Sequence, residues 1–288
     1  MSTAPHLAAV PTDPPGVTGP AAVASPWSRL AAVANRTWVR KLLLLALLAA
    51  AWEGYARQLA NPLLVPTLSD TVRALVQSVR DGELPGRVAI SLKLLLMGYA
   101  GGVGLAAVLA FAAAGTRIGA ELLELLTAML NPLPAVALLP LALLWFGIGA
   151  GSIVFVLVHS VVWPVALNAH AGFSSVSPTL RMVGRNYGLR GPLLALRILV
   201  PAASPHLLTG LKVGWAFAWR TLIAAELVFG VSSGRGGLGW FIYEKKSELD
   251  MPQVFAGLVT VVSIGLAVEH LVFRQLEART VRRWGMRT

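Results

Sequence analysis

Residues 125–180 read LLTAMLNPLPAVALLPLALLWFGIGAGSIVFVLVHSVVWPVALNAHAGFSSVSPTL, a run of 56 residues without Asp, Glu, Lys or Arg. A helix needs only about 20 mostly apolar residues to cross the hydrocarbon core of a bilayer, so this run is too long for one span. It divides near residues 145–151, where closely spaced glycines weaken a helix. The stretch therefore predicts two membrane-spanning helices, at 121–145 and 150–170.

The remainder of the chain repeats this apolar pattern. Of its 288 residues, 56% are hydrophobic and 13% are charged, whereas soluble domains carry about 25% charged residues. Long apolar runs without strict alternation indicate helices, because lipid leaves only helices or closed barrels with satisfied backbones. This composition excludes an ordinary soluble enzyme, a disordered regulator and a disulfide scaffold. We predict an all-α polytopic membrane protein with six transmembrane helices, at 39–59, 88–114, 121–145, 150–170, 206–230 and 252–273.

The basic residues indicate the orientation of these spans. The net charge of +11 arises from 24 Lys and Arg against 13 Asp and Glu. The excess lies before the first span, in the loop at 171–205 and after the last span, whereas the loops after spans 1 and 5 are nearly balanced. Since Lys and Arg accumulate on the cytoplasmic side, we expect both termini and the 171–205 loop there. Nucleic-acid binding is not expected, because the basic residues lie beside spans rather than on one soluble face.

Three regions follow from this pattern. The chain begins with a stretch rich in Pro, Ala, Gly, Ser and Thr that lacks the basic and apolar regions of a signal peptide. We expect a disordered cytoplasmic tail at 1–37, a six-helix transmembrane domain at 38–275 and a basic cytoplasmic tail at 276–288.

The 171–205 loop has a helix–turn–helix pattern of its own. Pro178 can occupy the first turn of a helix, and Gly188 can end it in a left-handed conformation. A second amphipathic piece follows at 193–200, and we expect Pro201 to stop it.

One face of the first loop helix is apolar. Leu180, Val183 and Tyr187 recur with helical spacing, while Arg181 and Arg185 lie four apart on another face. An exposed apolar stripe beside charged residues suggests a protein partner. The alternative is an interfacial helix that rests among lipid headgroups.

The loop also carries a frame of spaced residues, namely Met182-Val183-Gly184, Gly188, Ile198 and Val200-Pro201. This frame resembles the loop of inner-membrane permeases of binding-protein-dependent ABC importers, written Glu-Ala-Ala, three residues, Gly, nine residues, Ile, one residue, Leu-Pro. The spacing matches throughout, but Met182 replaces the acid and Val and Gly replace the two alanines. The resemblance implies the type I ABC importer permease architecture.

Further segments resemble the nitrate/sulfonate/taurine/bicarbonate branch of this family, in matching order and spacing. These segments are Leu63-Leu64-Val65-Pro66-Thr67, Asn131-Pro132-Leu133-Pro134, Leu139-Pro140-Leu141-Ala142, Trp145-Phe146-Gly147-Ile148-Gly149, Thr209-Gly210-Leu211, Ala224-Ala225-Glu226, Gly236-Gly237-Leu238-Gly239 and Arg282-Arg283-Trp284-Gly285.

The resemblance implies partners and an ATPase-coupling loop. In the family, this loop holds a coupling helix that docks in a groove of a cytosolic ATPase subunit. An extracytoplasmic substrate-binding protein would dock over the loops at 60–87 and 231–251, and a second permease copy, commonly identical, would complete the path. No Gly-x4-Gly-Lys-Ser/Thr motif occurs, so we expect no cofactor here and ATP use by the partner. The implied coupling residues are Leu180, Arg181, Met182, Val183, Gly184, Arg185, Tyr187, Gly188, Leu189, Ile198 and Pro201.

Two charged residues lie within the predicted span at 206–230. Intramembrane charges usually face a bundle interior or a wet cavity. We hypothesise that Arg220 attracts an anion in the translocation path and that Glu226 belongs to the outer gate or the binding-protein contact. The alternative is a structural hydrogen bond to a neighbouring helix. No metal site is expected, because the five His residues form no i,i+4 pair.

The prediction is thus a non-enzymatic permease of the cell inner membrane. Its substrate would be a small anion such as nitrate, an aliphatic sulfonate or taurine, and the alternative substrate is a heterocycle of the thiamine-precursor type. A different class, the ion-coupled secondary transporter, would need an intramembrane acid or His relay and usually paired halves. A membrane scaffold without transport is the third possibility.

Overall fold

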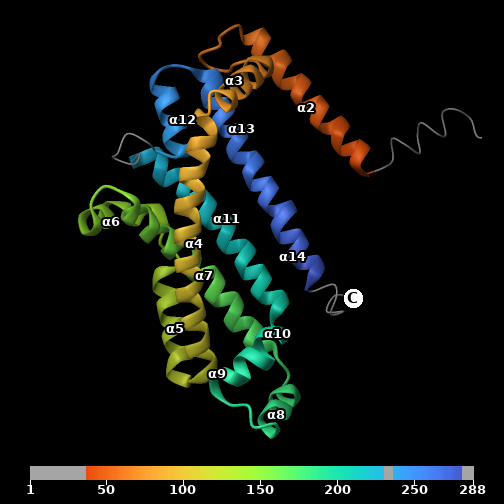
Figure 1. Cartoon of the computed structure of the whole chain (residues 1–288), viewed down its shortest axis with the longest axis vertical. Coiled ribbons are helices and arrows are strands. Elements are labelled where there is room, and N and C mark those ends of the chain that lie inside the picture. The colour runs from red at the N-terminus through yellow and green to blue at the C-terminus, as the bar shows by residue number, and fades with distance from the viewer. Residues whose placement is uncertain (1–36, 230–235, 281–288) are drawn as a thin grey trace, which may run out of the picture. The chain divides into compact units, whose positions relative to one another are not determined.

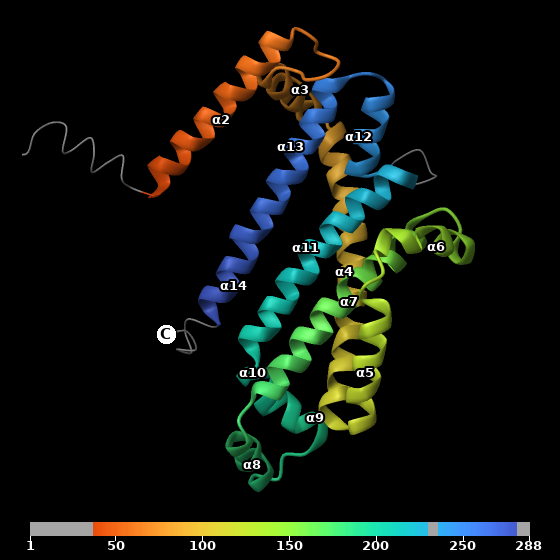
Figure 2. The same cartoon turned by 180° about the vertical axis from the view of Figure 1, so that it is seen from behind.

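The computed structural model describes residues 37–229 and 236–280, and every regular element in them is a helix (Figure 1; Figure 2). The predicted all-α fold is therefore confirmed. The tail predicted at 1–37 lies outside the described residues except for Thr37, and so do residues 281–288 of the predicted C-terminal tail.

The chain divides into two units, Met1–Trp52 and Glu53–Thr288, with the boundary inside α2 (Thr37–Leu59). In the first unit, Leu42, Leu45 and Leu48 each expose more than half of their surface. Lipid tails are as apolar as leucine, so such a helix is suited to a hydrocarbon environment.

The second unit is built around α4 (Glu83–Gly115), α7 (Ala150–Ser175) and α11 (Ser204–Phe229), which pack along one another in both views (Figure 1; Figure 2). Their shared core includes Leu95, Leu157 and Leu222, all fully buried. The other elements are α3 (Leu68–Arg80), α5 (Arg117–Leu130), η1 (Ala135–Leu138), α6 (Leu139–Phe146), α8 (Pro178–Asn186), α9 (Gly191–Leu194), η2 (Ala195–Leu199), α10 (Val200–Ala202), α12 (Leu238–Ser247), α13 (Met251–Ala267), η3 (Val268–Phe273) and α14 (Arg274–Arg279).

Within the described residues, three helical runs are long and apolar enough to cross a membrane: Glu83–Gly115, Ala150–Ser175 and Met251–Arg279. The bent pair Arg117–Leu130 and Ala135–Phe146 brings the number to four if it forms one span. The other two predicted spans correspond to α2 and α11, which carry charged residues along their length and do not meet the same test. The membrane-helix fold is thus supported, and the number six stays a prediction.

The span predicted as one helix at 121–145 is interrupted. α5 ends at Leu130, and the helical segments on either side of the break are bent by 85°. Pro132 and Pro134 cause this break, since neither has an N–H group to continue the helical hydrogen-bond ladder. The following break, before α7, lies at Gly147–Gly149, where Gly147 has a φ of +71°.

Two glycines let α4 approach α7 closely. Gly98 and Gly102 are buried, and a Cβ at Gly98 would lie 2.3 Å from Cβ of Leu157. At Gly102 the corresponding distance to Cβ of Val161 is 2.5 Å. Both separations are far below van der Waals contact, so only glycine permits this helix spacing.

Candidate functional site

The predicted start and end of the first loop helix are confirmed. The Ser177 hydroxyl caps α8 by accepting a hydrogen bond from the backbone N–H of Leu180 at 3.3 Å, and Pro178 is the first helical residue. The helix ends before Gly188, whose φ of +78° lies in the left-handed region that favours glycine.

The expectation that Pro201 stops the second piece is wrong. The chain stays helical from Gly191 to Ala202 through α9, η2 and α10. Five residues of this run form a π-helix, and the N–H of Val200 donates to the carbonyl of Ala195. Pro201 sits in the first turn of α10, where its missing N–H and fixed φ are tolerated.

The predicted apolar stripe is exposed. Leu180 exposes 39% of its surface, Val183 43% and Tyr187 83%, and Met182 beside them exposes 55%. Gly184, by contrast, is buried. The loop therefore presents apolar side chains on α8 that nothing in the described residues covers.

Several other residues of the loop hold its two helical pieces together. A Cβ at Gly184 would lie 2.6 Å from Cδ1 of Leu194 and 3.1 Å from Cγ1 of Ile198, so glycine lets α8 pack closely on the α9–η2 run. The N–H of Leu189 donates to the Gly184 carbonyl at 3.0 Å and closes the end of α8. Gly184, Leu189 and Ile198 therefore shape the loop rather than its exposed face.

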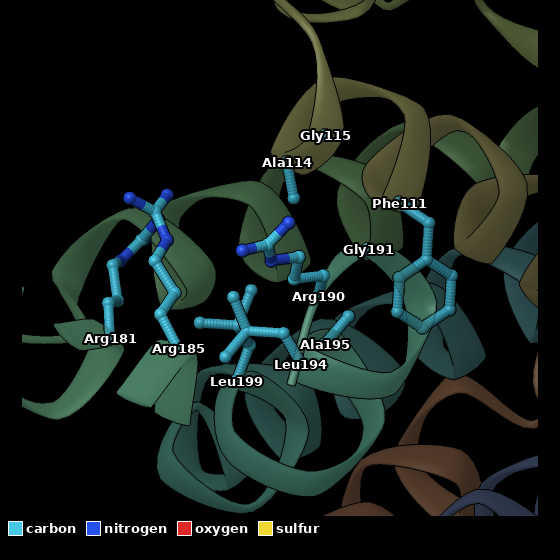
Figure 3. A pocket seen from close by; sticks show the side chains of 10 residues that line it. All are labelled: Phe111, Ala114, Gly115, Arg181, Arg185, Arg190, Gly191, Leu194, Ala195 and Leu199. Atoms are coloured by element: carbon cyan, nitrogen blue, oxygen red, sulfur yellow. The ribbon is translucent and has the colours of Figure 1, made fainter. Parts of the chain in front are cut away.

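The three arginines nearest the turn of the loop surround one cavity (Figure 3). Arg181 also ties α8 to α7: its guanidinium donates to the carbonyl of Phe173 and, at 3.3 Å, to that of Val176. Arg185 and Arg190 are exposed. Arg181 thus fixes the position of α8, while the other two contribute positive charge.

Arg220 lines a second cavity, of about 520 Å³, together with residues 131–136 from the break after α5. Its Nε donates to the Ala216 carbonyl at 3.1 Å, and its guanidinium carbon lies 5.0 Å from the centroid of the Phe217 ring. Within the described residues no acidic side chain pairs with Arg220. The cavity therefore has an uncompensated positive charge in its wall, which favours anions.

Glu226 lies apart from this cavity and is fully buried. The Ser91 hydroxyl lies 2.9 and 2.8 Å from its two carboxylate oxygens, and the N–H of Gly239 donates to it at 2.8 Å. The N–H of Leu238 in turn donates to the Ser91 oxygen at 2.8 Å. The carboxylate therefore caps the first turn of α12 and connects α11, α4 and α12.

The Gly-Gly-Leu-Gly segment makes this contact possible. A Cβ at Gly237 would lie 2.1 Å from Oε1 of Glu226, and a Cβ at Gly239 would lie 2.6 Å from its Cβ. The structure accordingly does not bring Arg220 and Glu226 into one site.

Sequence reasoning missed the ionic contacts that join distant segments. Arg87 contacts Glu244 at 2.5 Å and the Gly236 carbonyl at 3.1 Å, which connects α4 with α12. Partial burial lowers the pKa of Lys245, but its hydrogen bond to Glu248 and the charges of neighbouring glutamates outweigh burial and raise the pKa overall. The sequence shows that charged residues lie outside the predicted spans, but their spacing does not reveal which of them form ion pairs with each other.

Lys212, inside the predicted fifth span, is another such case. Its ammonium lies 2.8 Å from Glu269 of η3 and 3.9 Å from Glu277 of α14. The pair joins α11 to the end of the last long helix, and its position at one end of α11 suits a partly hydrated ion pair.

Comparison with known proteins agrees with this geometry. Residues 102–282 match the family described as the binding-protein-dependent transport system inner membrane component. The chain is 30% identical over 235 residues to an ABC transporter permease protein of Methanocaldococcus jannaschii, covering 80% of this chain and 87% of that protein. It is 29% identical over 246 residues to the taurine transport system permease protein of Escherichia coli (82% and 86%) and 27% identical over 244 residues to the nitrate import permease protein of Synechocystis sp. (81% and 86%).

The helical fold and these similarities define a membrane permease, which is a transport subunit and not an enzyme. The chain belongs to the family of binding-protein-dependent transport system inner membrane components, and it is a permease subunit of an ABC importer. This membership confirms the resemblance found in the 171–205 loop, and it implies an ATPase and a substrate-binding protein as partners.

Proposed function

We propose that this permease forms the translocation path for a small anion, such as nitrate, an aliphatic sulfonate or taurine, delivered by an extracytoplasmic binding protein. The observation that carries the proposal is the guanidinium of Arg220 in the wall of the 520 Å³ cavity, which has no acidic partner among the described residues. Two related permeases are named for taurine and for nitrate, which share an oxyanion group. A guanidinium is suited to such groups because its donors match two oxygens at once.

Arg220→Gln is expected to raise the KM for anion uptake about tenfold, the effect of losing one charge-assisted hydrogen bond. Uptake of labelled taurine, aliphatic sulfonate and nitrate into proteoliposomes with the ATPase and binding protein measures the effect. Arg220→Lys keeps the charge and should retain more of the uptake. Arg117→Gln removes an exposed arginine outside the cavity and is the matched control. Unchanged kinetics in Arg220→Gln with all three anions would remove this residue from the path.

In the proposed orientation both termini and the 171–205 loop are cytoplasmic, and α3 and α12 lie outside. α3 and α12 both pack on α13, at the same end of the second unit (Figure 1). Val72, Val76 and Val79 form an exposed apolar stripe on α3. This end is our proposed docking face for the binding protein, and Glu226 contributes to the outer gate by positioning α12.

The cytosolic ATPase is proposed to dock on the exposed apolar side chains of α8, centred on Val183. A pair of ATPase subunits on two copies of this permease would use the ATP, so this chain needs no cofactor of its own. Movement of the docked ATPases would shift the two loops and change which side of the path is open.

Val183→Glu is expected to abolish co-purification of the ATPase with the permease, because a charge would replace an apolar contact at the centre of the interface. Leu193→Glu is the matched control, since Leu193 lies in the same loop with similar exposure, 46% against 43%. Pull-down of the co-expressed complex in mild detergent measures the result. Retention of the ATPase by Val183→Glu, or its equal loss in both variants, would contradict docking on this stripe.

A further inference from the structure

The proposed docking of the ATPase uses the exposed apolar side chains of α8 and leaves the basic cavity of the loop without an assigned ligand. Its volume is about 590 Å³, and Arg181, Arg185 and Arg190 line it together with the end of α4 at Ala114 and Gly115. Figure 3 shows Arg190 extending toward Ala114, with Arg181 and Arg185 on the other side of the hollow. In the described residues, Arg185 and Arg190 have no ion-pair partner. No acidic residue occurs between positions 125 and 225 of the sequence, and none of the residues that line the cavity is acidic.

An apolar groove lies next to this cavity. Its volume is about 290 Å³, and Phe111 lines both spaces. The Phe111 ring stacks on Phe173 with a centroid distance of 5.7 Å, which places this pair at the junction. All residues of the groove are apolar, and they are Val103, Ala107, Ala110, Phe111, Val165, Ala169, Phe173, Leu196, Val200, Leu207 and Leu211.

We propose that the basic cavity and the apolar groove together bind one anionic phospholipid, with its phosphate among the arginines and an acyl chain along the groove. Guanidinium groups pair with phosphate oxygens through charge-assisted hydrogen bonds. Basic pockets between membrane helices on the cytoplasmic side are suited to anionic headgroups. The backbone carbonyls at the C-terminal end of α4 carry a partial negative charge of about half an elementary charge, which repels an anion. The positive charges of the three arginines outweigh this repulsion.

The apolar groove distinguishes a lipid from a free oxyanion. A dissolved phosphate or sulfonate would fill only the basic cavity and would leave the groove without an occupant. A phospholipid fills both spaces and connects α8 to α4 and α7. This site goes beyond the proposed transport function, because it assigns a bilayer component the task of bracing the 171–205 loop against α4 and α7.

Native mass spectrometry of the purified full chain, titrated with dioleoyl phosphatidylglycerol or dioleoyl phosphatidylcholine, tests the proposal. We expect one phosphatidylglycerol bound at least about tenfold more tightly than phosphatidylcholine, and Arg190→Gln to lose about that factor. Arg197→Gln is the matched control, because Arg197 is exposed in the same loop but does not line the cavity. Ala107→Phe should weaken phosphatidylglycerol binding by filling the groove, whereas Val108→Phe, at an exposed neighbour with 64% exposure, should not.

Three outcomes would overturn the lipid site. Equal losses in Arg190→Gln and Arg197→Gln would mean a general charge effect. Full displacement of the lipid by millimolar inorganic phosphate, with no effect of Ala107→Phe, would mean a site for a free oxyanion. Unchanged lipid binding in Arg190→Gln, combined with loss of the co-expressed ATPase, would mean that the arginines form part of the protein interface.

Discussion

Gly98→Ala is expected to lower the free energy of unfolding in detergent by about 1–3 kcal/mol, the range for overpacking a well-packed interior. The new methyl group would lie 2.3 Å from Cβ of Leu157, an atom that cannot move without its backbone. α4 and α7 would have to separate, and their contact is the most extensive between helices in the described residues. Thermal unfolding followed by size-exclusion chromatography in detergent measures the loss.

Gly104→Ala provides the matched control on the same helix. A Cβ at Gly104 meets no atom within 4 Å, so the same methyl group enters open space. Because alanine favours the helix over glycine by up to about 1 kcal/mol, this variant should be as stable as the wild type or slightly more stable. Equal midpoints for Gly98→Ala and Gly104→Ala would show that the close approach of α4 and α7 does not depend on Gly98.

Glu226→Ala is expected to cost about 2–5 kcal/mol, because it leaves buried donors without an acceptor and opens a cavity. The N–H of Gly239 and the Ser91 hydroxyl would both lose their bonds to the carboxylate. The first turn of α12 would then have no connection to α11 through this residue. The thermal midpoint in detergent and the rate of binding-protein-dependent uptake should both fall.

Glu226→Gln separates a hydrogen-bonding role from a role for the charge. The glutamine amide keeps an acceptor for Gly239 and offers a donor to Ser91, so its cost should be at most about 1.5 kcal/mol. If Glu226 acts by positioning α12, this variant keeps normal uptake. If uptake falls in Glu226→Gln while its stability is unchanged, the negative charge itself works in the gate. Glu248→Ala, at an exposed glutamate, controls for loss of charge at the same end of the unit.

Most of the helix positions could be predicted from local patterns. The apolar run after Glu124 requires at least two helices, and the glycines at 147–149 separate them in the structure. The pattern of the 171–205 loop predicts a first helix that starts at Pro178 and ends near Gly188, as the structure shows. These features are local, because the hydropathy of a segment and the backbone conformations allowed by its prolines and glycines depend on that segment alone.

The helix predictions that were wrong concern prolines, because a proline can either end a helix or occupy the first turn of a new one. Pro201 was expected to end a helix, but a π-turn before it places the proline at a new helix start. The sequence predicts one helix at 121–145, but α5 ends before Pro132 and Pro134, and the helical segments on either side are bent by 85°. Which outcome occurs depends on the packing of neighbouring helices, and a single segment carries no information about its neighbours.

The class of this protein is already evident in its sequence, which predicts membrane-spanning helices, carries a basic loop with the spacing of a coupling motif and contains no P-loop motif. The roles of individual charged residues, by contrast, become visible in the folded protein. Arg220 lines a cavity, Glu226 holds α12, and Arg181 ties α8 to α7. The physical reason is that hydrophobicity is a property of a segment, whereas the role of a charge depends on the groups within a few ångströms of it, and these come from parts of the chain far apart in sequence.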